Sequence, residues 1–308
     1  MMPELPEVET VVRLLRRQGL VRRWVTGCEV FWERTVGGDA LEFCRQVTGL
    51  EIRGLGRRGK YIVLPVVTGS QDDSSRARRG RTGRTGRTCG TLLVHLRMSG
   101  RLYLCLPSEE RSGYERAVLT LDDGRELRFH DPRKFGRMEL AGAGDRRLRR
   151  LGVEPLGKQF SEHQFVELIR GRRRMLKPLL LDQTVIAGLG NIYVDEALWE
   201  AGLHPLRLAG SLSVGEARRL AQGVVTVLRR GIANSGTSLG RGQINFVLPG
   251  ARATSSAPLA VAVDARNQED LRVFRRTGGA CFRCGAQIER LIVAQRSTHI
   301  CPRCQQPQ

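Results

Sequence analysis

Four cysteines near the end of the chain constrain its fold more than any other feature. They form two Cys-x-x-Cys pairs, Cys281/Cys284 and Cys301/Cys304, separated by sixteen residues. Two such pairs at this spacing are typical of a tetrahedral zinc site on a β-hairpin ribbon. The alternative is four unpaired thiols, which would leave this short, arginine-rich segment without a core. The pattern predicts one zinc ion in a ribbon of residues 266–308. That ion is structural, because four thiolates leave no coordination position open.

The net charge of the chain restricts the classes of molecule that it is expected to bind. The 308 residues include 51 Lys and Arg against 31 Asp and Glu, a net charge of +20. Such an excess indicates a polyanionic partner, either nucleic acid or an anionic membrane surface. No segment approaches the roughly 18 apolar residues of a membrane span, and no apolar signal-peptide segment follows the first residues. We therefore expect a cytoplasmic, nucleoid-associated protein that binds nucleic acid.

The first ten residues hold two prolines and three glutamates. If translation starts at Met2 and that methionine is removed, Pro3 carries a free secondary amine. An α-amino group titrates near pH 8, so a fraction is nucleophilic at neutral pH and can form an iminium with a sugar carbon. Glu4 is close enough to transfer protons. The same residues also fit an ordinary helix start, because Pro suits a first turn and Glu suits the positive end of the dipole.

A helix behind this start is expected in either case. Its apolar side chains follow the i, i+3, i+4, i+7 spacing of a core face. They are Val8, Val11, Val12 and Leu15.

Two methionines precede Pro3. If Met1 is retained, the nitrogen of Pro3 is a tertiary amide without basicity. Methionine aminopeptidase needs a small second residue, and Met2 is not small. We therefore expect synthesis to begin at Met2 and Met1 to be an artefact of the assigned start.

Several motifs along the chain match one protein family. Together with the opening Pro-Glu-Leu-Pro-Glu-Val-Glu-Thr, they resemble formamidopyrimidine-DNA glycosylase, a bacterial enzyme family that removes oxidised purines from DNA. The resemblance covers residues 2–238 and 267–306, apart from 68–90. Its further motifs are Arg-Arg-Gly-Lys-Tyr at 57–61, His-Leu-Arg-Met-Ser-Gly at 95–100, Asp-Pro-Arg-Lys-Phe-Gly at 131–136, Leu-Gly-Val-Glu-Pro-Leu at 151–156 and Gly-Leu-Gly-Asn at 188–191.

The resemblance implies an α+β fold in three parts. Residues 2–150 would form a β-sandwich with the N-terminal helix against it. Residues 151–265 would form a helix–two-turn–helix DNA-binding domain, and 266–308 the zinc ribbon. It also implies a monomer that holds double-stranded DNA in a basic cleft between its two halves.

The catalytic roles that the resemblance implies fall on four residues. Pro3 would be the nucleophile and Glu4 the acid/base. Lys60 would protonate or orient the sugar, although a lysine beside glycines is ordinarily just a solvated turn residue. Arg296 would enter the DNA groove, touch a phosphate and assist the late elimination. Glu7 would fix the terminus.

Three further residues would act as a wedge in the DNA stack. Met98, Arg133 and Phe135 would fill the gap left by a flipped-out nucleotide and keep the duplex kinked. On local grounds Met98 fits a core position equally well. Arg133 can also hydrogen-bond the orphaned base.

Other contacts would hold the DNA backbone. Asn191 stands at a Gly-rich helix start whose N–H groups can hold a phosphate. Arg173 matches a DNA-contacting position of the family, although the run 172–174 also fits a solvated surface. Tyr114 stands where we expect a family histidine.

The chain departs from the family pattern in two segments. Residues 68–90 repeat Arg, Gly and Thr and predict a disordered basic insertion, which either attracts phosphates or is a neutral hairpin extension. Residues 239–263 lack the usual pattern of the loop that caps the extruded base, so they give no lesion preference.

Two other functions remain open at this point. One is the sister class of enzymes specific for oxidised pyrimidines, against which the opening residues argue. The other is a zinc-ribbon DNA-binding protein without catalysis. Pro3 discriminates between them, because chemistry needs this residue and binding does not.

Overall fold

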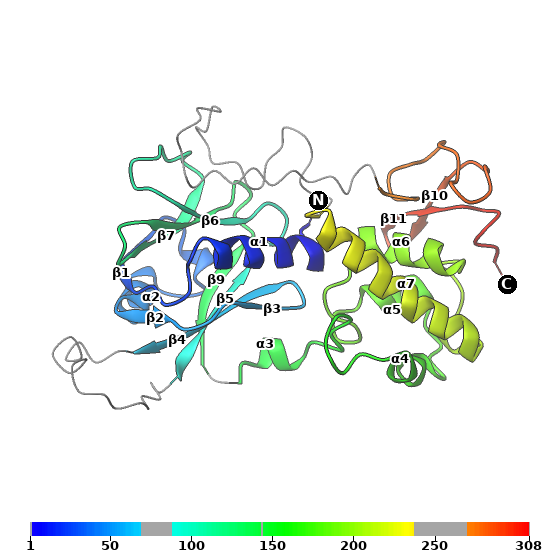
Figure 1. The fold of residues 1–308 in the computed structure, drawn as a ribbon, viewed down its shortest axis with the longest axis horizontal. Helices are drawn as coiled ribbons and strands as arrows, with labels where there is room; N and C mark the ends of the chain where they lie inside the picture. Colours follow the sequence, from blue (N-terminus) through cyan, green and yellow to red (C-terminus); the bar gives the residue numbers. More distant parts are fainter. Residues whose placement is uncertain (1, 69–87, 143, 237–269, 308) are drawn as a thin grey trace.

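The protein consists of two lobes bridged by its first helix (Figure 1). The computed structural model describes residues 2–68, 88–142, 144–236 and 270–307. Most of the predicted insertion and all of the segment 239–263 lie outside these residues. Within the described residues, no helix has the length and apolar character needed to cross a membrane.

The N-terminal lobe is built from two antiparallel sheets. One has the order β1-β7-β8-β6 and the other β2-β4-β5-β9, with β3 paired to β4. The first sheet comprises Val25–Val30, Glu115–Leu121, Glu126–His130 and Arg101–Cys105, in that spatial order. The second comprises Leu50–Ile52, Tyr61–Thr68, Thr88–His95 and Arg137–Ala141, with Gly56–Arg58 beside Tyr61–Thr68. Helix α2 (Ala40–Val47) packs on β1 and β9. The α+β class and the predicted sandwich are confirmed.

Helix α1 (Leu5–Arg17) contributes to the cores of both lobes. Val8 and Leu15 are fully buried in the sandwich core, where the helical spacing places them. Leu5, one turn earlier, belongs instead to the core of the C-terminal lobe. The beginning of α1 therefore lies at the boundary between the lobes.

The C-terminal lobe is helical. Its elements are α4 (Glu162–Ile169), α5 (Leu176–Leu181), α6 (Asn191–Ala201) and α7 (Val214–Ala233), and the short α3 (Arg146–Arg149) precedes the lobe beside the sandwich. A capping box begins α7, since Glu216 N donates to Ser213 Oγ at 3.2 Å and Ser213 N donates to Glu216 Oε2 at 2.8 Å. Helix α6 is buried almost all round and forms the centre of the lobe.

The C-terminal ribbon packs on α6. Strands β10 (Glu289–Val293) and β11 (Arg296–Ile300) pair antiparallel. Ala294 and Gln295 connect them with φ values of 49° and 59°, as a two-residue hairpin turn requires. Among the described residues β11 pairs with β10 alone, and its contacts with α6 place its other edge toward that helix.

Candidate active site

The start of α1 is buried against the start of α6. Pro3 is buried, and Leu5 N donates to Gly188 O at 3.0 Å. The carboxylate of Glu4, only 3% exposed, accepts hydrogen bonds from Ile192 N at 3.0 Å and from Tyr193 N at 3.3 Å. These N–H groups lie in the first turn of α6, where the helix dipole favours an anion. The two halves of the chain thus meet at the residues predicted to be catalytic.

Two glycines permit this close approach. A Cβ at Gly190 would lie 2.4 Å from Glu4 Cδ, and a Cβ at Gly188 would lie 2.6 Å from Leu5 Cδ1. Gly188 also has φ +96°, which disfavours other residues. We expected this Gly-rich helix start to hold a DNA phosphate. The anion that it holds in the structure is the carboxylate of Glu4, which satisfies the same backbone donors.

Glu7 anchors the first turn. Its Oε2 accepts from Glu4 N at 2.9 Å, and its Oε1 accepts from the hydroxyl of Tyr193 at 3.0 Å. A Cβ at Gly236 would lie 2.8 Å from Glu7 Oε1, so the end of α7 also closes on this carboxylate. These contacts agree with the expected role of Glu7 in fixing the terminus.

Lys60 lies in the turn between β3 and β4 and is 4% exposed. It is therefore not the solvated turn residue of the ordinary interpretation. The turn is held from the other lobe by Glu154, whose Oε2 accepts from Gly59 N at 2.9 Å and from Arg58 Nη1 at 3.0 Å. The sequence offered Glu154 only as part of the 151–156 motif, with no indication of its partners.

Burial shifts the ionisation of these groups. It raises the pKa of Glu4 from 4.5 to about 7; the positive charge of Lys60 opposes the rise and the negative charge of Glu7 adds to it. Burial lowers the pKa of Lys60, with Glu4 and Glu7 opposing and Arg296 contributing to the decrease. A carboxyl group that titrates near neutral pH is suited to both accept and donate a proton there.

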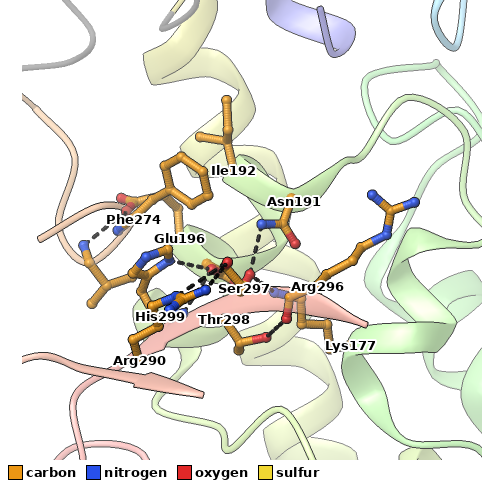
Figure 2. Close-up of polar contacts among 12 residues, drawn as sticks. Lys177, Asn191, Ile192, Glu196, Phe274, Arg290, Arg296, Ser297, Thr298 and His299 are labelled. Carbon is orange, nitrogen blue, oxygen red and sulfur yellow. Dashed lines mark hydrogen bonds and ion pairs between the residues drawn. The ribbon is translucent and has the colours of Figure 1, made fainter. Parts of the chain in front are cut away.

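The hairpin places Arg296 near the start of α6. Arg296 is exposed and begins β11. Figure 2 shows the strand passing the start of α6, with Asn191 and Lys177 directed toward it. Asn191 Nδ2 donates to Ser297 O at 2.8 Å, so in this structure its amide contacts the ribbon.

The predicted wedge residues lie on two adjacent loops. Met98 is 39% exposed between β5 and β6, and Phe135 is 49% exposed between β8 and β9. Met98 is thus not a core methionine. The guanidinium of Arg133 lies over the ring of Phe135, 5.1 Å from its centroid.

Asp131 ties these two loops together. It is fully buried, accepts from Gly136 N at 2.6 Å and Arg133 N at 3.2 Å, and also binds the hydroxyl of Ser99. Sequence reasoning missed this role. The sequence did contain an indication of it, because Asp131 directly follows a strand and is itself followed by Pro132.

Tyr114 lies beside Asp131, whose N–H donates to Tyr114 O at 2.9 Å, whereas Arg173 lies in the other lobe. Tyr114 is 49% exposed, and its ring meets the edge of His130 at 5.7 Å. Arg173 is exposed between α4 and α5. No contact in the described structure assigns either residue a role.

The four ribbon cysteines form a metal-binding cluster. Their sulfur atoms all lie within 4.8 Å of one another. Trp199 Nε1 and Arg283 N each donate to Cys281 Sγ at 3.4 Å. Burial alone would raise the pKa of Cys281, but these and neighbouring hydrogen bonds lower it to about 6, whereas burial and the adjacent thiols raise the pKa of Cys301 and Cys304. Four sulfurs at these positions fit a tetrahedral zinc ion.

Three family models match consecutive parts of the chain. The formamidopyrimidine-DNA glycosylase N-terminal domain matches residues 2–138, the formamidopyrimidine-DNA glycosylase H2TH domain 151–241, and the zinc finger found in FPG and IleRS 278–307. The chain belongs to the formamidopyrimidine-DNA glycosylase family. The predicted membership is confirmed.

Relatives in this family match over the full length. The formamidopyrimidine-DNA glycosylase of Protochlamydia amoebophila is 41% identical over 306 residues, and the match covers 99% of both chains. That of Herpetosiphon aurantiacus is also 41% identical, covering 99% of this chain and 100% of the relative.

Solved structures with the same fold include complexes with damaged DNA. The Lactococcus lactis Fpg bound to DNA containing an abasic site has a TM-score of 0.80 and 32% identity, covering 99% of this chain and 100% of that one. The L. lactis Fpg complex with DNA containing Fapy-dG has a TM-score of 0.79, with the same identity and coverage.

Proposed function

We propose that the protein is a base-excision repair enzyme. It removes oxidised purines, 8-oxoguanine and formamidopyrimidines, from duplex DNA and then cuts the strand as an AP lyase. The observation that carries this proposal is the buried Pro3–Glu4 terminus, held by the first turn of α6 next to Lys60. The family relatives carry the formamidopyrimidine-DNA glycosylase name, and their complexes contain damaged DNA. A substrate in chromosomal DNA places the enzyme in the cytoplasm on the nucleoid.

The first chemical step needs the free nitrogen of Pro3. Once Met2 is removed, the lone pair of this nitrogen attacks C1′ of the deoxyribose, and the bond to the damaged base breaks with its electrons. The nitrogen loses its N–H proton, and the departing base takes one. The nitrogen lone pair then expels O4′ from C1′, which forms the iminium and opens the sugar, and O4′ takes a proton. Glu4 is suited to supply it, because its pKa of about 7 leaves a protonated fraction at neutral pH.

The second stage cuts the strand. The iminium between Pro3 and C1′ acidifies the C2′ proton, and its loss expels the 3′ phosphate. A second elimination then expels the 5′ phosphate. Lys60 and Arg296 balance the negative charge that develops, and the lowered pKa of Lys60 lets it exchange a proton with Glu4.

The DNA lies across the surface that carries Met98, Phe135 and Arg296. The exposed side chains of Met98 and Phe135 fill the gap left by the extruded nucleotide. Zinc holds the ribbon in its folded form, so that Arg296 is presented to the DNA. One monomer carries the complete set of groups.

Borohydride trapping tests this proposal. Protein with Pro3 at its N-terminus, incubated with an 8-oxoguanine duplex and sodium borohydride, should form a covalent crosslink. Pro3→Gly should abolish strand cleavage and leave DNA binding largely intact. Absence of a crosslink in the wild type would instead favour a DNA-binding protein without catalysis. Intact mass and N-terminal sequencing of natively expressed protein check the start, and Met1 retained on fully active material would exclude Pro3 as the nucleophile.

A further inference from the structure

Two adjacent carboxylates on α6 hold the ribbon independently of its cysteines. Asp195 and Glu196 are each 1% exposed. Asp195 binds the hairpin strand β11, whereas Glu196 binds the segment that leads into the ribbon. Figure 2 shows the Glu196 side of this arrangement together with the strand residues.

Asp195 joins the free edge of β11 to α5. Its Oδ2 accepts from the backbone N–H of His299 at 2.9 Å and lies 3.1 Å from His299 Nδ1. Its Oδ1 accepts from Lys177 Nζ at 2.5 Å, and the same ammonium donates to Ser297 O at 3.0 Å. Together with Asn191, these side chains pair the edge groups of β11 that have no strand beside them. Such pairing fixes the register of the edge, because a shift by one residue would remove these partners from Ser297 O and His299 N.

Glu196 makes a separate set of contacts. Its Oε1 accepts from the backbone N–H groups of Arg272, Val273 and Phe274 at 3.0, 2.9 and 3.0 Å. These hydrogen bonds hold the chain entering the ribbon and include no group of β11, although the ring of Phe274 packs on that of His299, 5.0 Å between centroids. The two neighbouring carboxylates therefore separate the docking of the ribbon from the placement of its hairpin.

We propose that Asp195 is a positioning residue for Arg296, an inference that rests on the proposed function of Arg296. Arg296 precedes Ser297, whose carbonyl is fixed by Lys177 and Asn191. Asp195 fixes Lys177 from one side and His299 from the other, so it sets the position of β11 along the start of α6. Arg296 thereby keeps one location relative to Glu4 and Lys60.

The buried, charged nature of this link supports a positioning role. Lys177 and the Asp195 side chain are fully buried, and burying such charges is unfavourable unless both are fully paired. Apolar side chains of similar size would stabilise the contact at least as well, but they would not define the register of a strand edge. The ion pair and its hydrogen bonds have directional geometry, and this geometry defines the position of β11 relative to α6.

The variant Asp195→Asn tests the proposal. Asn keeps one oxygen, but its NH2 group must face either Lys177 Nζ or the His299 N–H. In single-turnover assays with saturating 8-oxoguanine DNA, we expect strand cleavage to slow by roughly ten- to a hundredfold, the effect of about 1 Å of misplacement. DNA affinity should change less than about threefold, and zinc content should stay at the wild-type value. Cleavage at the wild-type rate would overturn the proposal.

Glu196→Gln is the matched control. It makes the same chemical change at the next residue, with the same burial, but Glu196 has no hydrogen bond to β11 and its segment meets the strand only through the rings of Phe274 and His299. We expect cleavage near the wild-type rate. Equal slowing by both variants would show that the effect is only structural and would overturn the proposal.

A double-mutant cycle with Arg296→Ala provides the decisive measurement. If Asp195 acts through Arg296, the double variant is no slower than Arg296→Ala alone. Additive losses contradict the proposal. If Asp195→Asn loses zinc, His299→Phe replaces it. This variant removes the contact between His299 Nδ1 and Asp195, and its cleavage rate is compared with and without Arg296→Ala in the same way. If the wild-type protein forms no borohydride crosslink, the proposed function itself is refuted. If it does crosslink but the losses of cleavage rate in the two single variants add in the double variant, only this inference is refuted.

Discussion

Glu4 is an ionisable residue whose proton affinity depends on folding. In the folded chain, burial raises its pKa from 4.5 to about 7. Between these pH values the folded state binds a proton that the unfolded state has lost. By linkage, the free energy of unfolding then decreases as pH rises. The contribution of Glu4 to stability is complete below pH 4.5 and is lost as pH rises through about 7.

We expect Glu4→Gln to flatten this dependence. The neutral amide cannot titrate, so the variant should gain stability relative to the wild type as pH rises from 4.5 to 7.5. The relative gain should be on the order of 3 kcal/mol at most, because each pKa unit corresponds to about 1.4 kcal/mol. Urea unfolding at several pH values measures it. Parallel stability curves for the two proteins would show that Glu4 ionises normally in the fold.

The sequence predicted the identity of these residues better than their environment. Pro3, Glu4 and Lys60 were indicated by local motifs, because each lies in a short pattern of the family. The partners that bury and bind the Glu4 carboxylate were not indicated, because Ile192 lies 188 positions away in the chain. Asp195 was missed for the same reason, since its strand partner is 104 positions away.

At the scale of elements, the start of α6 depends on glycine at two positions. Gly188 and Gly190 leave space that Leu5 and Glu4 occupy. Local patterns predicted α1 well, since its apolar periodicity is encoded within one helix. They could not predict that the N–H groups of α6 would bind a side chain of α1, because that requires both lobes to be folded.

We expect Gly190→Ala to displace Glu4 and greatly reduce base excision. The new Cβ would lie 2.4 Å from Glu4 Cδ, and the overpacking should destabilise the fold by about 1–3 kcal/mol. Gly215→Ala on α7 is the control, since its Cβ would meet only Arg219 Nη1 at 3.9 Å. Single-turnover excision and thermal unfolding distinguish the two variants. Normal excision by Gly190→Ala would mean that the contact between Glu4 and α6 is dispensable.

The zinc ribbon should lose its fold when the metal is removed. Chelation or Cys301→Ser should unfold it and weaken DNA binding, because structural zinc contributes on the order of 10 kcal/mol to such modules. Metal analysis should find one zinc per chain, and titration with labelled duplex follows the affinity. Fully active protein without zinc would contradict this expectation. Cys105→Ser is a control on a cysteine outside the cluster.

At the scale of the molecule, a net charge of +20 predicts strongly salt-dependent DNA binding. Each phosphate contact releases counterions, so Arg296→Ala should lower the slope of log affinity against log salt by about one. Arg45→Ala serves as the control, because Arg45 is on α2 in the other lobe and pairs with Glu42 (Figure 1). Fluorescence anisotropy at several salt concentrations measures both slopes. An unchanged slope for Arg296→Ala would exclude a phosphate contact.

Deletion of residues 70–88, of which all but Thr88 lie outside the described structure, should reduce this slope modestly. Cleavage chemistry should remain intact on saturating DNA, because the predicted role of the segment is nonspecific attraction. Loss of turnover would show that the segment belongs to the active site.

The sharing of α1 between two cores has a consequence for biosynthesis. Glu4 is among the first residues to leave the ribosome, but its hydrogen-bond partners Ile192 and Tyr193 are synthesised almost 190 residues later. At about 5–20 residues per second, the terminus stays accessible for roughly 10–40 s. Pro3 is buried once α6 has folded against it. If Pro3 is the nucleophile, the peptidase that removes Met2 must therefore act within that interval. The rate of translation then determines what fraction of the enzyme molecules carries a free Pro3 nitrogen.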